Sequence, residues 1–199
     1  MAKRKNKKEL IGLIIILIGA GLIFYKLYST EKIEIEEKKA IDNYFVEVKN
    51  DEINEDIVED NNTNNSINYI AVLNIPKIDL ERGLVDPNSY LNDVDYNVEI
   101  LKDSDMPDKE NGNVILASHS GSSRVAFFNG LKYLNLGDEI IIYYKNKKYI
   151  YNVSNIYLIE KTGEAEIKRD SNINTLTLIT CKSYTNKQIV VISNLTKIE

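Results

Sequence analysis

The segment Thr175-Leu176-Thr177-Leu178-Ile179-Thr180-Cys181 has the pattern of a β-strand that ends at a nucleophilic side chain. Its β-branched residues favour extended backbone, and its threonines alternate with its leucines, which places the two sets on opposite faces of a sheet. Because Cys181 closes the strand, its side chain is predicted to emerge at the rim of a barrel. It is the chain's only cysteine, so an intramolecular disulfide is excluded.

Other short runs with strand character lie between residues 69 and 199, where no long 3.6-residue apolar period persists. We predict strands at residues 69–75, 113–118, 139–144, 148–158, 175–180 and 188–193. Turn residues separate them at Asn111-Gly112, residues 136–138 and residues 145–147, and a short helix is predicted over residues 125–134. Such short, closely spaced strands suggest a mainly β domain that forms a closed or nearly closed barrel.

The composition fits one ordinary domain with accessory segments. Of the 199 residues 43% are apolar, which is enough for a genuine core. The 30 acidic residues outnumber the 25 basic ones and give a net charge of −5. Nucleic-acid-binding proteins concentrate positive charge on one face, so this balance argues against nucleic acid as a partner.

Residues 10–28 are predicted to be a transmembrane signal anchor. Their only charged residue, Lys26, can extend toward the lipid headgroups. As a helix the segment spans roughly 28 Å at about 1.5 Å per residue, close to a bilayer core of about 30 Å. The basic tail at residues 1–9 predicts a cytoplasmic N-terminus and an extracellular remainder. The alternative is a cleaved signal peptide, but the following Leu27-Tyr28-Ser29-Thr30 is a poor match to a small-x-small cleavage site.

Residues 29–68 are predicted to be an acidic extracellular stalk. They end in an Asn-rich run at residues 60–66, which cannot bury enough apolar surface to order itself. Two interpretations remain open for the first part. A solvated spacer is favoured by the density of charge. A short helix close to the membrane is suggested by apolar residues that fall near one helical face, namely Ile33, Ile41, Tyr44, Phe45 and Val48.

The chain also has a single histidine, in the segment Leu116-Ala117-Ser118-His119-Ser120-Gly121. A free cysteine is largely protonated at neutral pH and attacks only as the thiolate, so a nucleophilic Cys181 needs a basic or cationic neighbour. His119 is the only imidazole available, and strand ends on one barrel face can bring distant residues together. Taken alone, Cys181 suits a buried core position and His119 a structural one. Together they favour thiol chemistry.

These two segments resemble those of the sortases, membrane-anchored cysteine transpeptidases of Gram-positive bacteria. In that family the nucleophile lies in a Thr-Leu-x-Thr-Cys stretch and the histidine lies in an earlier strand-loop segment. The resemblance covers about residues 69–199, including the opening strand at residues 69–78 and the segment Phe127-Phe128-Asn129-Gly130-Leu131. It implies that residues 69–199 form a catalytic domain with a closed eight-stranded β-barrel and one or two short helices.

The resemblance also implies a reaction. Cys181 attacks the Thr-Gly carbonyl of a C-terminal sorting signal like Leu-Pro-x-Thr-Gly, releases the downstream peptide and passes the acyl group to an amine of the cell-wall precursor. His119 serves the proton transfers. The implied partners are surface proteins that carry the signal, the peptidoglycan precursor or another amine acceptor, and membrane lipid around residues 10–28. No cofactor is implied.

One position departs from the family pattern. Sortases place an arginine soon after the cysteine, where it holds the substrate and stabilises the oxyanion, and no arginine follows Cys181. The position falls on Lys187 or Gln188, either of which can donate to an oxyanion, although neither reproduces a planar guanidinium fork. Alternatively, Arg124 or Arg169 supplies the fork, unless each is a solvated surface arginine. A third explanation is a weakened or inactive relative.

One acidic group is a candidate calcium site, because calcium takes six to eight oxygen ligands. Its members are Asp93, Asp95, Glu164 and Glu166. Their spacing is not that of an EF-hand loop, and an acidic surface suits the overall negative charge better. We therefore predict no required metal.

Two other functions remain open. A cysteine peptidase of the same fold would release the acyl group to water, because water and an amine compete for one thioester. A membrane-tethered adhesion or scaffold module would keep the barrel without turnover. Residues 44–68 are also long enough to contain a lid segment of the kind that pilin-type sortases carry.

Overall fold

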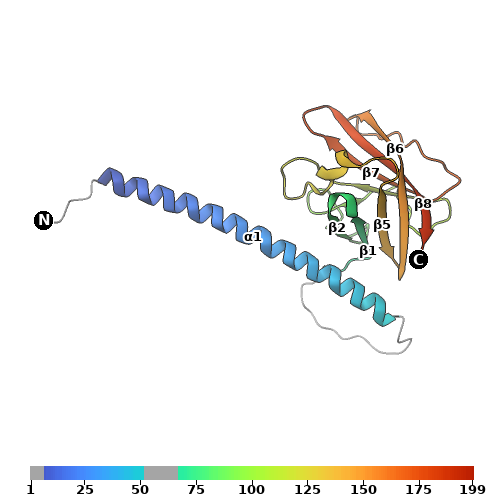
Figure 1. The fold of residues 1–199 in the computed structure, drawn as a ribbon, viewed down its shortest axis with the longest axis horizontal. Helices are drawn as coiled ribbons and strands as arrows, with labels where there is room; N and C mark the ends of the chain where they lie inside the picture. Colours follow the sequence, from blue (N-terminus) through green and yellow to red (C-terminus); the bar gives the residue numbers. More distant parts are fainter. Residues whose placement is uncertain (1–6, 52–66) are drawn as a thin grey trace. The chain divides into compact units, whose positions relative to one another are not determined.

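The computed structural model describes residues 7–51 and 67–199 (Figure 1). Three helices occur in these residues: α1 (Lys7–Asp51) and two 3-10 helices, η1 (Pro76–Ile78) and η2 (Phe127–Tyr133). The chain divides into two compact units, Met1–Lys39 and Ala40–Glu199. All of the strands belong to the second unit, and the candidate site is built there.

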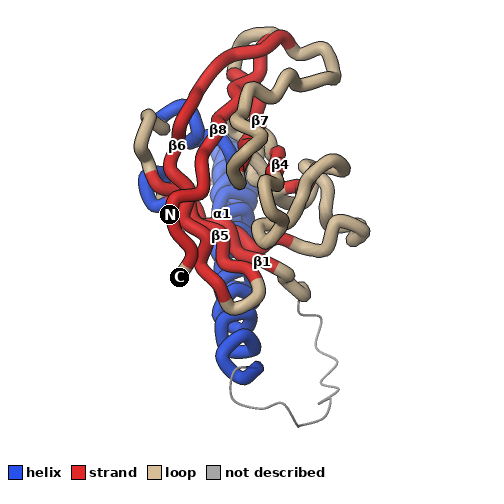
Figure 2. The backbone as a smooth tube through the Cα atoms, turned by 90° about the vertical axis from the view of Figure 1, so that its right-hand side faces the viewer, coloured by secondary structure: helices blue, strands red, loops and turns tan. Residues whose placement is uncertain are grey.

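Eight strands form one sheet in the order β2-β1-β5-β6-β8-β7-β4-β3. Their bounds are β1 Ala71–Ile75, β2 Leu80–Leu84, β3 Glu99–Ile100, β4 Asn113–Ala117, β5 Glu139–Tyr144, β6 Lys147–Glu160, β7 Thr175–Lys182 and β8 Lys187–Ile198. Neighbouring strands pair antiparallel except β4 and β7, which run parallel. The sheet curls into a nearly closed barrel, and Figure 2 shows β4, β7, β8 and β6 running side by side.

All six predicted strands are present, but two strands and one helix were missed. β2 reads Leu-Glu-Arg-Gly-Leu, which lacks β-branched residues, and it is extended because it pairs along its whole length with β1. β3 has two residues, too few to show any period. The helix predicted over residues 125–134 is confirmed as η2. The second short helix, η1, falls within the one or two that the resemblance implied, but the sequence pattern did not indicate its position.

The barrel is nearly closed, one of the two forms that the strand spacing predicted, and not fully closed as the resemblance implied, because the sheet ends at β2 and β3. Asn97, just before β3, bridges this seam with its side-chain amide. Its Nδ2 donates to the carbonyl oxygen of Gly83 at 2.9 Å, and its Oδ1 accepts from Nη2 of Arg82 at 3.3 Å. Asn97 is buried, so these bonds also satisfy a polar group that would be costly to leave unpaired. Between β2 and β3, hydrogen bonds of the Asn97 side chain therefore replace the backbone hydrogen bonds that would join two neighbouring strands.

The barrel interior is filled by one apolar cluster, to which β7 contributes Leu176 and Leu178. The threonines between them face the other way, because side chains alternate along a strand, yet Thr175 and Thr177 are also fully buried. The side-chain oxygen of Asn113 accepts a hydrogen bond from each of their hydroxyls at 2.9 Å. The first half of the parallel pair β4–β7 is thus buried on both faces, as parallel strands usually are, and these hydrogen bonds fix the start of β7 against β4.

The last part of α1 belongs to the unit that contains the barrel. Ile41 and Tyr44 are buried in a cluster with Val72 of β1, and the Tyr44 hydroxyl donates to the carbonyl oxygen of Tyr143 in β5 at 3.2 Å. Residues 40–48 are thus helical, and Ile41 and Tyr44 are buried, not solvated. The closeness of this helix to a membrane stays a prediction. The side chain of Ile33 lies outside the described residues.

Within residues 7–51 and 67–199, no helix combines the length and the mean hydropathy that a membrane crossing needs. The transmembrane part of the predicted fold is therefore not confirmed. The compact unit around the barrel begins at Ala40, earlier than the predicted start of the catalytic domain. The functional boundaries stay predictions, namely residues 1–9, 10–28, 29–68 and 69–199. Residues 52–66, in which part of the stalk and any lid would fall, lie outside the described residues.

Candidate active site

Parallel pairing of β4 with β7 brings the histidine segment to the cysteine. The register places Ala117 beside Ile179, and the pairing continues beyond the end of β4. The backbone N–H of Ser118 donates to the carbonyl oxygen of Ile179 at 3.3 Å, and the Thr180 hydroxyl donates to the carbonyl oxygen of Ser118 at 2.8 Å. The chain around position 118 is thereby tied to the residues just before Cys181.

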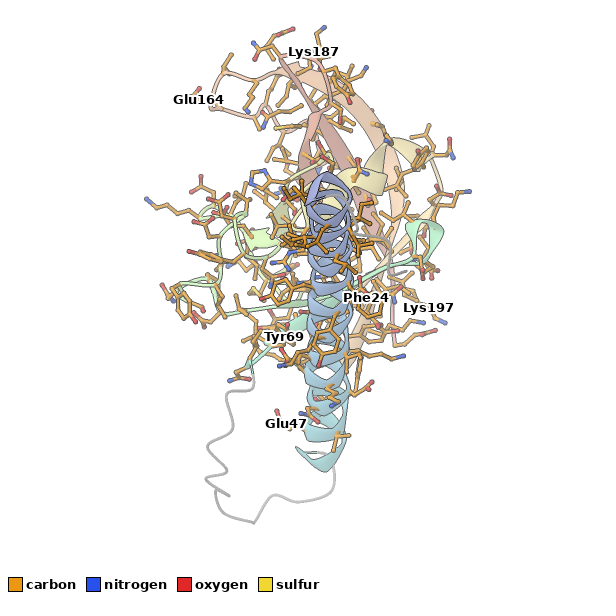
Figure 3. The ribbon with its side chains drawn as sticks, turned by 90° about the vertical axis from the view of Figure 1, so that its left-hand side faces the viewer. Phe24, Glu47, Tyr69, Glu164, Lys187 and Lys197 are labelled. Atoms are coloured by element: carbon orange, nitrogen blue, oxygen red, sulfur yellow. The ribbon has the colours of Figure 1, made fainter. Side chains whose placement is uncertain are left out.

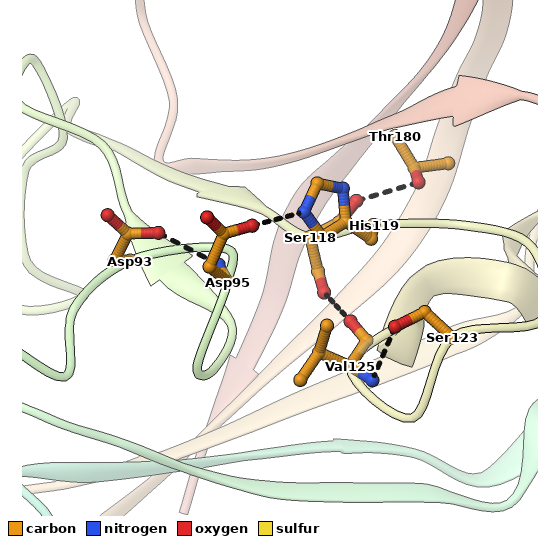
Figure 4. Close-up of polar contacts among 7 residues, drawn as sticks. All are labelled: Asp93, Asp95, Ser118, His119, Ser123, Val125 and Thr180. Carbon is orange, nitrogen blue, oxygen red and sulfur yellow. Dashed lines mark hydrogen bonds and ion pairs between the residues drawn. The ribbon is translucent and has the colours of Figure 1, made fainter.

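His119 is held at its backbone from both sides. The next residue, Ser120, donates its hydroxyl to the carbonyl oxygen of Cys181. The carbonyl oxygen of His119 accepts from the backbone N–H of Phe128 at 3.1 Å, which attaches the loop to η2. Ser118 donates its hydroxyl to the carbonyl oxygen of Val125 at 3.3 Å (Figure 4). The lone histidine and the lone cysteine, predicted as a pair, therefore lie on adjoining segments.

The imidazole of His119 has a partner that the sequence did not indicate. Its Nε2 lies 3.0 Å from Oδ1 of Asp95, in the loop before β3 (Figure 4). The His119 side chain is 40% exposed and that of Asp95 is 77% exposed. Among the contacts of the described residues, no hydrogen bond joins the imidazole to the Cys181 thiol, which is free and half-buried. Asp95 had been considered only as an acidic surface residue or a calcium ligand.

A groove of about 890 Å³ crosses the face of β4 and β7 that is turned away from the barrel core. Ile115 and Ala117 of β4 and Ile179 of β7 line it, together with the segment between β6 and β7 at residues 161–167. Gln188 of β8 lines it as well and is paired directly opposite Cys181. Directly opposed residues share a face of the sheet, so the thiol emerges on the face that carries the groove.

A second, smaller hollow is lined by Cys181 itself. It measures about 160 Å³, and its lining includes Ser120 of the histidine loop, Phe128 of η2 and Thr180 of β7. Cys181 therefore borders this hollow while its opposed neighbour Gln188 borders the groove. Cys181 itself lines the smaller hollow but not the groove.

The groove is apolar along its floor and charged along its rims. Charged residues of both signs line it: Glu99, Lys102, Asp103, Lys161 and Glu164. Burial raises the pKa of Glu99, the charge of Asp93 raises it further, and a hydrogen bond from the Val94 backbone opposes the shift. A raised pKa brings the carboxyl of Glu99 closer to neutrality. This rim therefore presents a carboxyl group that is costly to keep charged.

The structure separates the two residues considered in place of the missing arginine. Gln188 is half-buried, lines the groove and stands opposite Cys181. Lys187 is paired opposite Lys182, and its Nζ lies 3.5 Å from the carboxylate of Glu160. Figure 3 shows Lys187 and Glu164 at the same end of the barrel, away from Lys197 near the other end of β8. Of the two, only Gln188 is paired opposite Cys181 and lines the groove.

The two arginines considered as substitutes have different surroundings. Arg169 donates from Nη1 to the Thr175 hydroxyl at 3.2 Å and from Nη2 to the carbonyl oxygen of Asn111 at 3.1 Å. Thr175 is the first residue of β7, whereas Cys181 lies near the last. Arg169 is therefore bonded to the end of the strand that is far from the thiol. Arg124 is an exposed residue of the loop between His119 and η2.

The acidic residues weighed for calcium do not come together as a ligand set. Asp95 lies against His119, and Glu166 pairs with Lys168 at 3.5 Å. Across the described ranges, 7–51 and 67–199, no three side chains of metal-ligating type form a group that could hold an ion.

A β-barrel that presents a thiol beside an apolar groove, with an imidazole on the adjoining loop, defines a class of thiol enzymes. Residues 73–196 match the family model of the sortase domain. The chain belongs to the sortase family, whose members are cysteine transpeptidases. A similar protein is sortase A of Bacillus anthracis, which is 26% identical over 206 residues, 96% of each chain.

Solved structures share the fold. Sortase A of Listeria monocytogenes superposes with a TM-score of 0.54 at 21% identity, covering 66% of this chain and 89% of that one. A sortase D5 transpeptidase of Clostridium perfringens superposes with a TM-score of 0.60 at 22% identity, covering 81% of this chain and 99% of that one. These two structures extend the likeness from sequence to the barrel.

Proposed function

We propose that this chain is a sortase that cleaves an LPxTG-like C-terminal sorting signal between Thr and Gly and transfers the acyl fragment to a cell-wall amine. The observation that carries the proposal is the parallel β4–β7 pair, which sets the chain's only histidine on a segment bonded to the end of the strand that carries its only cysteine. The apolar groove beside them suits an extended peptide with small and apolar side chains.

The proposed reaction has two steps at one sulfur. In the first, the Cys181 thiolate attacks the threonine carbonyl carbon. The C–S bond forms, the C–N bond to glycine breaks, and His119 donates a proton to the departing amine. In the second, an acceptor amine attacks the thioester, His119 takes the proton from that amine, and the C–S bond breaks to restore the thiolate. The sulfur is neither oxidised nor reduced.

The test is intact-mass spectrometry of the full-length chain in detergent micelles, incubated with a small library of Leu-Pro-x-Thr-Gly-like peptides. We expect a covalent adduct with the mass of the peptide's N-terminal fragment. The matched control is the same chain alkylated beforehand, because the single cysteine makes alkylation specific for Cys181. If the unblocked chain alkylates readily but acylates with no peptide, the assignment to LPxTG-like signals is wrong.

A peptidase activity is a second candidate, favoured by the openness of the site. The His119 side chain is 40% exposed, and Cys181 is half-buried and lines a hollow of about 160 Å³, so water can reach a thioester at Cys181. Product analysis with and without an added amine distinguishes the two functions. A peptidase would yield the free acid at the same rate in both reactions, whereas a transpeptidase would yield the amide when the amine is present.

Gln188 is proposed to donate to the oxyanion in place of the missing arginine. The Gln188→Ala variant is expected to lower kcat about tenfold with little change in KM, because one neutral hydrogen bond contributes about 0.5–1.5 kcal/mol. The control is Lys187→Ala, which removes a side chain that is paired with Glu160 and is expected to leave kcat within about twofold. Steady-state cleavage of a quenched fluorescent peptide measures both. Equal losses of kcat in the two variants, or a loss only in Lys187→Ala, would contradict the assignment of Gln188 as the oxyanion donor.

We further propose that residues 10–28 anchor the chain in the cell membrane in a single pass, with the N-terminus cytoplasmic and the barrel outside. Large apolar side chains are exposed on α1 between Leu10 and Tyr25 and at Tyr28. A membrane-impermeant maleimide added to intact cells is expected to label Cys181, the only thiol of the chain. Labelling that appears only after the cells are lysed would place the barrel in the cytoplasm.

A further inference from the structure

We infer that Asp95 is the positioning residue for His119, an assignment that rests on the proposed function. Its Oδ1 lies 3.0 Å from Nε2 of the imidazole. Figure 4 shows Asp95 on one side of the ring and Thr180, the residue before Cys181, on the other. In this arrangement Nε2–H donates a hydrogen bond to the Asp95 carboxylate, which leaves Nδ1 as the nitrogen that exchanges a proton with the reacting groups.

The loop that carries Asp95 is shaped by hydrogen bonds of its own. The backbone N–H of Asp95 donates to Oδ1 of Asp93 at 2.8 Å. The carbonyl oxygen of Asp93 accepts from the backbone N–H groups of Tyr96 and Asn97 at 2.9 and 2.8 Å. Asp93 therefore closes a turn around Asp95, and the carboxylate is presented from a defined backbone.

This turn is anchored to the barrel through the buried Asn97, which bridges to β2 by its bonds to Gly83 and Arg82. The guanidinium of Arg82 in turn lies over the ring of Phe127 at 3.9 Å. Phe127 is the first residue of η2, and the backbone N–H of the second, Phe128, donates to the carbonyl oxygen of His119. The carboxylate and the backbone of the histidine are thus both braced against the same seam of the barrel.

A held ring orientation matters because His119 sits on a Ser/Gly loop with its side chain 40% exposed. A freely rotating imidazole would present the reacting nitrogen only part of the time. Fixing the other nitrogen selects one ring orientation and one tautomer, as carboxylates do for catalytic imidazoles in other thiol and hydroxyl enzymes. Because Asp95 is itself 77% exposed, solvent screens the pair and the effect is modest.

The kinetic test compares Asp95→Ala and Asp95→Asn with the parent chain. Asp95→Ala is expected to lower kcat about fivefold with KM unchanged, the range that an exposed ion pair supplies. Asp95→Asn keeps an oxygen acceptor and is expected to recover part of this loss. The control is Asp108→Asn, which removes a surface carboxylate paired with Lys145 at 2.8 Å and is expected to leave kcat unchanged. An Asp95→Ala variant with unchanged or higher kcat would overturn the inference, the higher value showing that Asp95 restrains the imidazole.

A second readout needs no substrate. Because the chain has a single histidine, the ring ¹⁵N resonances of the labelled full-length chain in micelles report His119 alone. We expect Asp95→Asn to move the Nε2 resonance and Asp108→Asn to leave it in place. Superimposable spectra of the parent and Asp95→Asn chains overturn the inference. If the parent chain forms no acyl-enzyme although Asp95→Asn moves the resonance, the proposed function fails while the Asp95 contact to the ring stands.

Discussion

The Cys181→Ala chain is expected to fold as the parent does and to form no acyl-enzyme with any sorting-signal peptide. The thiol is the only group that can form the thioester, and removing a catalytic nucleophile costs about 10⁴-fold or more in kcat. Cys181 is half-buried at the rim of the sheet, so its loss leaves no large cavity and is expected to change stability by less than about 1 kcal/mol. Intact-mass spectrometry and thermal unfolding measure the two quantities.

His119→Ala is the informative companion to this variant. It keeps the thiol but removes the proton donor, a role that contributes about 10²- to 10⁴-fold in other enzymes. The His119→Ala chain is therefore expected to be acylated slowly, whereas the Cys181→Ala chain is expected not to be acylated at all. An adduct that persists in Cys181→Ala would mean that another side chain is acylated, and the sulfur chemistry proposed for this site would have to be abandoned.

Ile41→Ala is expected to lower the free energy of unfolding of the barrel unit by about 2–4 kcal/mol, because Ile41 is 3% exposed and packs with Val72 and Val85. The melting temperature should fall by about 2–4 °C for each kcal/mol. The matched control is Val46→Ala on the same helix, at a side chain that is 57% exposed, with an expected change within about 0.5 kcal/mol. Calorimetry of the full-length chain measures both. Equal small changes would show that α1 does not dock on the sheet in solution.

The packing of α1 on the barrel is also expected to make the stability depend on pH, through the buried phenol of Tyr44. Burial raises the pKa of the Tyr44 phenol to about 12, with a smaller contribution from Tyr144, against about 10 in an unfolded chain. Because the pKa is raised on folding, the stability linked to this proton is fully present below about pH 10 and is lost as the pH rises toward 12. Unfolding curves between pH 8 and 12 (roughly the span of the two values) are expected to show this loss in the parent but less of it in Tyr44→Phe.

Much of the fold could be predicted from short-range pattern. Six of the eight strands and η2 were found because alternation and turn residues are local signals. β2 and β3 could not be found that way, because their extended backbone comes from the strands beside them. The end of α1 was ambiguous for a related reason. Its charges suit solvent, and only the neighbouring face of β1 and β5 makes burial of Ile41 and Tyr44 favourable.

The residues of the candidate site also fall into some that the sequence indicates and others that only the structure reveals. Cys181 and His119 stand out in the sequence because each is the only residue of its type and each lies at the end of an apolar run. The choice between Lys187 and Gln188 could not be made without the β7–β8 register, which places Gln188 opposite the thiol. Asp95 was invisible as a partner for His119, because a loop carboxylate acquires its neighbour only when the barrel seam forms.

The sequence by itself determined the chemical types available for reaction, one thiol and one imidazole, and the strand that ends at the thiol, because composition and alternation are properties of the chain alone. The tertiary structure decided which side chains those two groups meet. Asp95 comes from a loop distant in the chain, Gln188 comes from the next strand, and the groove is lined by several elements. Their positions follow from strand order, register and burial, which the local sequence pattern does not encode.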